Sequence, residues 1–241
     1  MSTPVTTAFS GFHPEAIQFL ADLAANNDRA WFQPRKAEYE RLLKEPLAAL
    51  VTVLTERFAE RDVPLLADPA RSPFRIYRDV RFSKDKSPYK TNVGASFPWI
   101  EGRAAASGGP GAQGAGRHEV GGYFHLAPGD IFVGGGMWHP GPAALIAFRQ
   151  AIVSDRARVH VALDEQGFRA QYGHVNGDRL KRVPAGHAVD DPDAELLKLK
   201  DVVFGKRLAD ADAASPELPD LVADALAAAI PVLRFLASLG T

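Results

Sequence analysis

Six basic side chains fall within sixteen residues in the first half of the chain, between Arg75 and Lys90. Two acidic residues interrupt them, so this basic segment carries a local charge of +4, whereas the whole chain carries −1 and the remainder therefore −5. Cations gathered on an otherwise acidic protein attract anions, and the planar arginine fork matches the oxygens of phosphate or carboxylate. The basic segment predicts a binding site for a phosphorylated or nucleotide-like ligand.

The predicted ligand-binding residues combine cations with one carboxylate and one aromatic ring. They are Arg78, Arg81, Asp85, Lys86, Tyr89 and Lys90. The cations supply the attraction, Asp85 orients them, and Tyr89 offers a face for stacking or a hydroxyl for hydrogen bonding. Pro88 is expected to set the turn that positions Tyr89 and Lys90, because its ring holds φ near about −65°.

Three other functions are compatible with the same residues. In an enzyme acting on a phosphoester, the cations would stabilise developing charge while Asp79, Asp85 or His125 transferred protons. Neighbouring cations lower the pKa of a carboxyl group, however, which favours salt bridges over proton donation by the two aspartates. A protein or nucleic-acid interaction module is another alternative, although the near-neutral total charge argues against extended nucleic-acid binding. In a purely structural motif, Arg78 and Asp85 would form a buried ion pair.

A second candidate segment, Ile131 to Pro142, runs from a strand pattern through three glycines into a helix pattern. Free amides at a helix start can hold an anion. The segment lacks both the phosphate-binding loop and the dinucleotide-binding glycine pattern, so we favour a bulge or close backbone packing. A functional role would require it to converge with the basic segment in one pocket.

The absence of cysteine excludes disulfides, thiolate zinc sites, iron–sulfur clusters and cysteine nucleophiles. His118 with Glu119, or His125 with His139, could bind zinc through imidazole nitrogens, but no histidine pair has the spacing of a metal site on a helix. We predict no metal site, and the sequence specifies no cofactor. The serines of the basic segment lack a recognisable base, which argues against a serine hydrolase.

The stretch from Asp79 to Thr91 reads Asp-Val-Arg-Phe-Ser-Lys-Asp-Lys-Ser-Pro-Tyr-Lys-Thr. It resembles the hallmark of the conserved hypothetical family called domain of unknown function 2461. The resemblance extends to Gly122–Leu126, Gly134–Pro140 and Arg182–Gly186, so it covers most of the chain. Because that family has no assigned activity, the resemblance implies no catalytic residue. The Gly102–Gly116 stretch looks like an insertion relative to the family pattern.

The elements that must position these residues are first of all helices. In the N-terminal third, helical spacing of apolar residues predicts a helix from Pro14 that ends at Asn26–Asn27, a short turn capped by Asp28, and a helix that begins at Glu45. After the strands, it predicts a helix from Gly141–Pro142 that continues in shorter pieces through Asp164, and one turn over Glu195–Lys200. The last predicted helix is Pro216–Leu239, with a kink at Pro231. The helices therefore occupy both ends of the chain.

Strand patterns lie between these helical regions. Alternation of apolar and polar residues predicts strands over Pro73–Phe82, Asn92–Trp99, Val120–Leu126 and Ile131–Gly135, arranged as an antiparallel meander. Arg78 breaks the first alternation, which suggests a bulge or a paired guanidinium. The predicted fold is α+β, with a helical N-terminal third, a central mostly antiparallel sheet of about four to five strands and a helical C-terminal part.

The bulk composition suits one folded unit. With 241 residues, 46% hydrophobic and 24% charged, we predict a single domain over residues 1–241, with a core from about residue 9 to 239 and a flexible Gly/Ala-rich loop at 102–116. The N-terminus has no signal-peptide pattern, and no stretch reaches the roughly 18 apolar residues of a membrane span. We therefore expect a soluble cytoplasmic protein without a membrane partner; its oligomeric state is left open.

Overall fold

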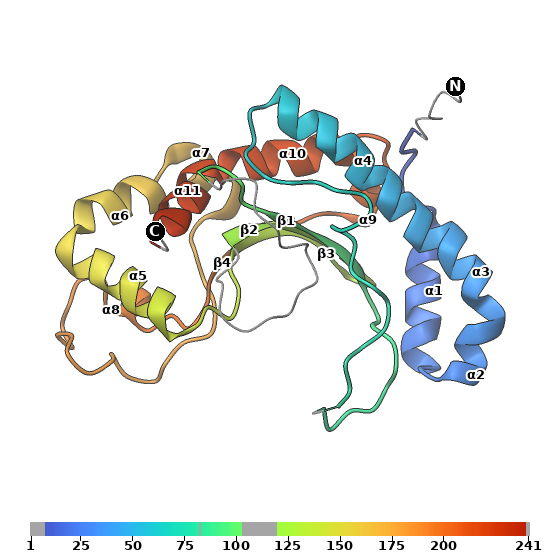
Figure 1. Ribbon diagram of the computed structural model, residues 1–241, viewed down its shortest axis with the longest axis horizontal. Helices are drawn as coiled ribbons and strands as arrows, with labels where there is room; N and C mark the ends of the chain where they lie inside the picture. The colour runs from blue at the N-terminus through green and yellow to red at the C-terminus, as the bar shows by residue number, and fades with distance from the viewer. Residues whose placement is uncertain (1–7, 82, 103–119, 240–241) are drawn as a thin grey trace.

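The computed structural model describes residues 8–81, 83–102 and 120–239, and it has the predicted α+β architecture, a central antiparallel sheet flanked by helices (Figure 1). The strands are β1 (Val93–Pro98), β2 (Val120–Ala127), β3 (Asp130–Met137) and β4 (Val202–Arg207). They lie in the order β1-β2-β3-β4, each antiparallel to its neighbour. The predicted antiparallel arrangement is therefore confirmed for three of the four predicted strands, which correspond to β1, β2 and β3.

The N-terminal third is a nearly continuous series of helical turns. It comprises α1 (Pro14–Ala25), α2 (Arg29–Phe32), a 3-10 turn (Gln33–Arg35), α3 (Lys36–Tyr39), a π turn (Glu40–Lys44) and α4 (Glu45–Glu60). Pro14 occupies the first turn of α1, where its missing amide costs nothing. As predicted, Asp28 caps the next helix by accepting a hydrogen bond from the Trp31 amide at 2.9 Å. These turns form one end of the molecule (Figure 1).

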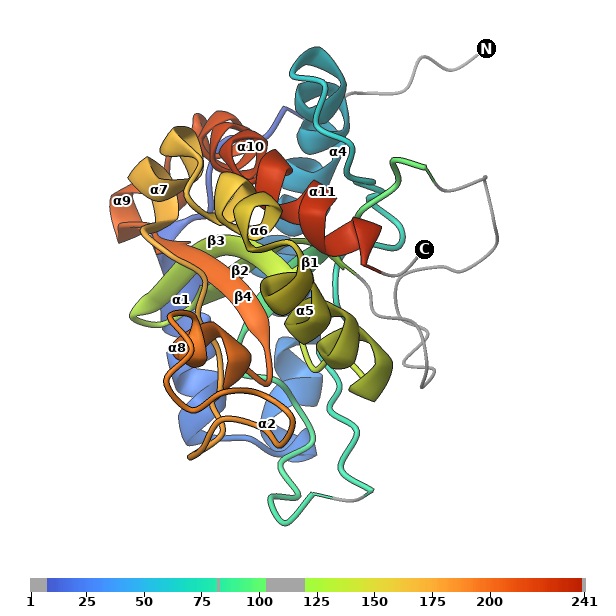
Figure 2. The same cartoon turned by 90° about the vertical axis from the view of Figure 1, so that its left-hand side faces the viewer.

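Helices also follow β3 and β4. They are α5 (Pro142–Ser154), α6 (Arg156–Leu163), α7 (Gln166–Tyr172), α8 (Ala194–Leu197), α9 (Asp210–Ala213), α10 (Leu218–Ala228) and α11 (Ile230–Ser238). The last two are bent by 52° near Pro231, as expected from the proline. Both pack on the sheet, and α4 packs on α10, so these helices cover one sheet face (Figures 1 and 2).

Alternate strand residues are buried against these helices. In β1, the core side chains are those of Val93, Ala95 and Phe97, none more than 3% exposed. Tyr123 and His125 of β2 point to the opposite face and are only half-buried. Polar side chains of the sheet are therefore accessible to solvent on this second face.

The predicted strand over Pro73–Phe82 is wrong. Over its described residues, 73–81, the segment makes only isolated bridges, from Pro73 to Ala95 and from Tyr77 to Tyr89. The second bridge pairs the segment with the chain that returns toward β1. The described residues between 73 and 92 therefore leave the sheet as a two-armed loop beside α1, the excursion (Figure 1). Its alternation has a different cause, because Ile76 is buried in the core, whereas the neighbouring Arg75 and Tyr77 are exposed. Phe82 lies outside the described residues.

β4 was not predicted, although Val202-Val-Phe204 is a recognisable strand pattern. The pattern was missed because it is short and because Gly205 and two basic residues follow it. Its partner strand β3 carries the glycines predicted to mark close packing or a bulge. A Cβ atom on Gly134 would lie 2.2 Å from the Phe204 carbonyl oxygen, and Gly136 has φ +118°, so both positions require glycine.

Within the described residues, no single helix is both long and apolar enough to cross a membrane; α10 and α11 meet that test of length and composition only as a bent pair. The Gly102–Gly116 loop prediction falls almost entirely outside the described residues.

Candidate functional site

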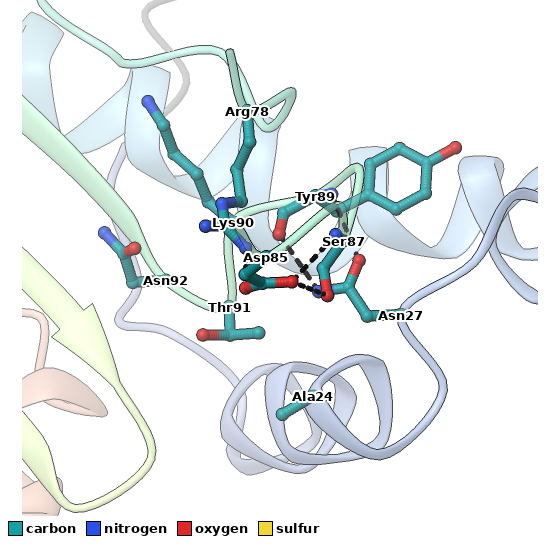
Figure 3. A pocket seen from close by; sticks show the side chains of 9 residues that line it. All are labelled: Ala24, Asn27, Arg78, Asp85, Ser87, Tyr89, Lys90, Thr91 and Asn92. Carbon is teal, nitrogen blue, oxygen red and sulfur yellow. Dashed lines mark hydrogen bonds and ion pairs between the residues drawn. The ribbon is translucent and has the colours of Figure 1, made fainter. Parts of the chain in front are cut away.

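A pocket of about 290 Å³ lies between the C-terminal end of α1 and the basic segment (Figure 3). Its lining combines side chains from these two regions and from the start of β1. The lining residues are Ala24, Asn27, Arg78, Asp85, Ser87, Tyr89, Lys90, Thr91 and Asn92. Four of the six predicted ligand-binding residues are therefore brought together here, namely those at positions 78, 85, 89 and 90.

Asn27 joins the two sides of the pocket. Its amide oxygen accepts a hydrogen bond from the Tyr89 N–H at 3.0 Å, and its amide nitrogen donates to the Tyr89 carbonyl at 3.0 Å. One side chain thus satisfies both main-chain groups of a residue 62 positions away. This double hydrogen bond holds the return arm of the excursion against the end of α1.

Arg78 and Asp85 form an ion pair in the pocket. The Asp85 carboxylate accepts from the Arg78 Nη1 and also from the Ser87 N–H and hydroxyl, at 2.9 and 2.7 Å. The Arg78 guanidinium, followed by the Ser87 groups, holds the pKa of the Asp85 carboxyl well below its usual range. The carboxyl group is therefore ionised and unsuited to proton donation. Because the Asp85 side chain is 57% exposed, this ion pair is not buried.

Lys90 runs alongside Arg78 on the facing arm, with its ammonium directed away from Asp85 (Figure 3). The ammonium lies 5.0 Å from the centre of the Phe74 ring, at cation–π distance. Within the described residues, no carboxylate forms an ion pair with it. Partial burial, and secondarily the charge of Arg75, lowers the pKa of the Lys90 amine.

Tyr89 contributes to the pocket differently from the sequence-based expectation. The residue is only 1% exposed, and its ring stacks on Phe32 with 4.1 Å between centroids. Figure 3 shows this ring pointing away from Arg78 and Lys90. The ring therefore belongs to the core and gives no face to a ligand, while its hydroxyl is buried without a hydrogen-bond partner in the described part of the chain.

Arg81 and Lys86 lie outside the pocket lining. Arg81 makes a two-pronged ion pair with Asp79, at 3.0 and 2.7 Å, and its side chain is 76% exposed. Hydrogen bonds from Arg81 lower the pKa of Asp79 to about 2, so this carboxyl is also ionised. Lys86 donates to the Val80 carbonyl at 2.9 Å. Both side chains act within the excursion itself.

The sequence-based prediction missed the neutral polar side chains of the pocket, which are those of Asn27, Ser87, Thr91 and Asn92. Asn27 was noted only as a helix end, and nothing in its own segment indicates a partner 62 positions away. Thr91 does complete the motif that carries the family resemblance. That motif was the available signal for including it.

Asn92 links the pocket to a second polar group on β2. Its amide nitrogen lies 3.4 Å from His125 Nδ1, and the Tyr123 hydroxyl lies 3.0 Å from the same nitrogen. Burial lowers the pKa of His125 and raises that of Tyr123 to about 12. At neutral pH the imidazole is therefore uncharged and able to accept a proton, whereas the phenol is held protonated and is a weak acid.

The glycine-rich segment from Ile131 to Pro142 does not contribute to the pocket lining. His139 pairs instead with the buried Asp201, whose carboxylate accepts from the His139 N–H at 2.7 Å. Across the described ranges, no group of three or more histidine or acidic side chains is arranged to hold a metal ion. His118 and Glu119 lie outside the described residues.

The fold and the site define a class: an α+β protein in which an antiparallel meander and a flanking helix carry a partly charged pocket. Residues 15–235 match the family described as "Conserved hypothetical protein (DUF2461)", and the chain belongs to this family. The resemblance seen in the sequence is thereby confirmed. No curated protein and no solved structure matches the chain. The family description names no activity or ligand.

Proposed function

We propose that the protein binds a small phosphorylated or otherwise anionic ligand in the pocket formed by Asn27 and the basic segment. The observation that carries the proposal is the juxtaposition of Arg78 and Lys90 in one pocket that contains a single carboxylate, Asp85. Two cations against one anion leave a local charge of +1 facing a partly enclosed space. Partial burial protects that charge from screening by salt.

The remaining donors suit phosphate oxygens. Arg78 binds Asp85 through one guanidinium nitrogen, which leaves its other N–H groups to form charge-assisted hydrogen bonds with a ligand. Thr91, Asn92 and Ser87 add hydroxyl and amide groups to the lining. A pocket of about 290 Å³ is at the small end of the range for ligand sites, about 300–1,000 Å³. It therefore fits a small metabolite better than a dinucleotide.

The test is calorimetric titration with inorganic phosphate, sugar phosphates and nucleoside monophosphates. Arg78→Gln should abolish the binding heat, because it removes the guanidinium that faces the ligand. Arg81→Gln is the matched control, since Arg81 is also paired with an aspartate of the same segment but lies outside the pocket. The control variant should retain the parent affinity.

Two results would contradict this proposal. One is an absence of binding across the whole panel at millimolar concentration. The other is an equal loss of affinity in both variants, which would indicate a diffuse charge effect of the segment. Thermal unfolding of each variant establishes that a lost signal does not come from a lost fold.

A second candidate, an enzyme acting on a phosphoester, is favoured by the contact between Asn92 and the His125–Tyr123 pair. In this second proposal, His125 would accept the proton, since its imidazole lies 3.4 Å from the amide nitrogen of the pocket residue Asn92. Assaying the same phosphate esters for release of inorganic phosphate tests it. Binding without release would favour a binding protein.

A further inference from the structure

The Lys90 amine has an unusual environment for a lysine in a basic segment. It is half-buried, it lies 5.0 Å from the centre of the Phe74 ring, and the charge of Arg75 acts on it. Arg78 lines the same pocket. The nearby carboxylate of Asp85 is engaged by Arg78 and the Ser87 groups instead. The other lysines of the segment, Lys84 and Lys86, are exposed.

Such surroundings make the amine easier to deprotonate than that of an exposed lysine, while the ammonium remains the form that contributes charge to the pocket. Burial removes water from the ammonium, and the neighbouring guanidinium group repels it, so both effects lower the pKa of Lys90. The uncharged amine is the nucleophilic form, and a partly desolvated lysine beside a cation is a common arrangement for attack on a carbonyl group. The amine also shares a pocket with Arg78, whose guanidinium binds Asp85 through one nitrogen and, within the described residues, keeps its other N–H groups available.

We propose that Lys90 forms an imine with the carbonyl carbon of a small phosphorylated aldehyde or ketone whose phosphate is held by Arg78. This deepens the proposed function and rests on it, because Arg78 supplies the phosphate contact. Figure 3 shows the two side chains lying next to each other, with Arg78 directed toward Asp85 and Lys90 directed away from it. The phosphate and the carbonyl group would therefore contact different parts of the pocket.

The reaction balances without a further reactant. The Lys90 nitrogen attacks the carbonyl carbon, and a proton moves from nitrogen to the carbonyl oxygen to give a carbinolamine. The C–O bond then breaks, one water leaves and the C=N bond forms, with no change in oxidation state. The Phe74 ring contacts Lys90 and also lies 5.8 Å from the Tyr123 ring. Neither Tyr123 nor His125 lines the pocket, and the proton that the nitrogen loses leaves with the hydroxyl group as that water.

The experiment uses pyridoxal 5′-phosphate as the phosphorylated aldehyde. Intact protein is incubated with it near neutral pH, the imines are reduced with borohydride, and modified lysines are located by peptide mass spectrometry. We expect a severalfold higher yield at Lys90 than at Lys84 or Lys86. Lys90→Arg, which keeps the charge, should remove the main adduct, whereas Lys86→Arg, the matched control, should leave it. Thermal unfolding checks that both variants fold.

Two further measurements separate this inference from the proposed function. Inorganic phosphate should reduce the yield at Lys90 and leave that at Lys84 unchanged, because only Lys90 shares its pocket with Arg78. Propionaldehyde, which has no phosphate, should still prefer Lys90 but with a lower yield.

Equal labelling of the three lysines by both aldehydes would overturn the imine proposal, and calorimetric binding of phosphate would then leave the proposed function standing. Preferential labelling of Lys90 that phosphate does not reduce, together with no calorimetric signal, would overturn the phosphorylated substrate class and the proposed function together.

Discussion

Replacing Asn27 with alanine removes both hydrogen bonds that join the end of α1 to the Tyr89 backbone. Tyr89 is only 1% exposed, so water has little access to the N–H and C=O groups that lose their partner. A hydrogen bond contributes about 0.5–1.5 kcal/mol net, and a buried polar group left unpaired costs about 1–3 kcal/mol. For two main-chain groups we expect the free energy of unfolding to fall by about 2–4 kcal/mol.

The assay is urea unfolding followed by fluorescence of the tryptophans. Asn26→Ala is the matched control, because the adjacent Asn26 is exposed and, in the part of the chain that is described, its side chain donates only to the Asp22 carbonyl of its own helix. The control should lose no more than about 0.5–1 kcal/mol. If the two variants unfold within about 0.5 kcal/mol of each other, the Asn27 bridge does not hold the excursion in place.

Two more predictions concern a buried hydroxyl and a titrating histidine. Tyr89→Phe removes a hydroxyl that is buried without a partner in the described residues, so unfolding free energy in urea should rise by about 1 kcal/mol; a fall of that size would refute this. The His160 ring lies between Asp164 at 2.8 Å and Asp193 at 2.9 Å, and hydrogen bonding, to Asp164 first, raises its pKa. The folded state therefore binds the proton more tightly, and this stabilisation is complete below the unfolded pKa of about 6.5 and lost as pH rises through the folded pKa. Thermal unfolding should show His160→Gln to be less stable than the parent at about pH 5 and equally stable at about pH 9; a constant difference across that range would contradict the assignment.

The helices were largely predictable because their signals are local. Pro14, Asp28 and the apolar spacing after Glu45 act over one or two turns, and each element formed where these residues indicated it. The bend at Pro231 has the same local origin, since proline removes one helical hydrogen bond. Such features depend little on the rest of the chain.

The strands were less predictable, since a strand forms only where the backbone of a neighbouring segment is available for hydrogen bonding. Pro73–Phe82 alternates like a strand, yet it leaves β1 after the bond from the Phe74 N–H to the Gly94 carbonyl. It then pairs with its own return arm, where the Arg78 N–H donates to the Pro88 carbonyl at 2.9 Å. β4 has a weaker pattern but finds β3 beside it, where the Gly134–Gly205 pair allows close approach. Alternation of apolar and polar residues indicates which side chains are buried and which are exposed. It does not specify which backbone segment pairs with the strand.

For the candidate site, the sequence by itself determined the charge, the segment that carries it and the family to which the chain belongs. Only the tertiary structure decided which cations share a pocket. It placed Arg78 and Lys90 together, turned the Tyr89 ring into the core and left Arg81 outside with Asp79. The physical reason is that residue types set the charge that is available. The burial and the ion pairing of each side chain, which determine its pKa and its access to a ligand, depend on contacts with distant residues such as Asn27.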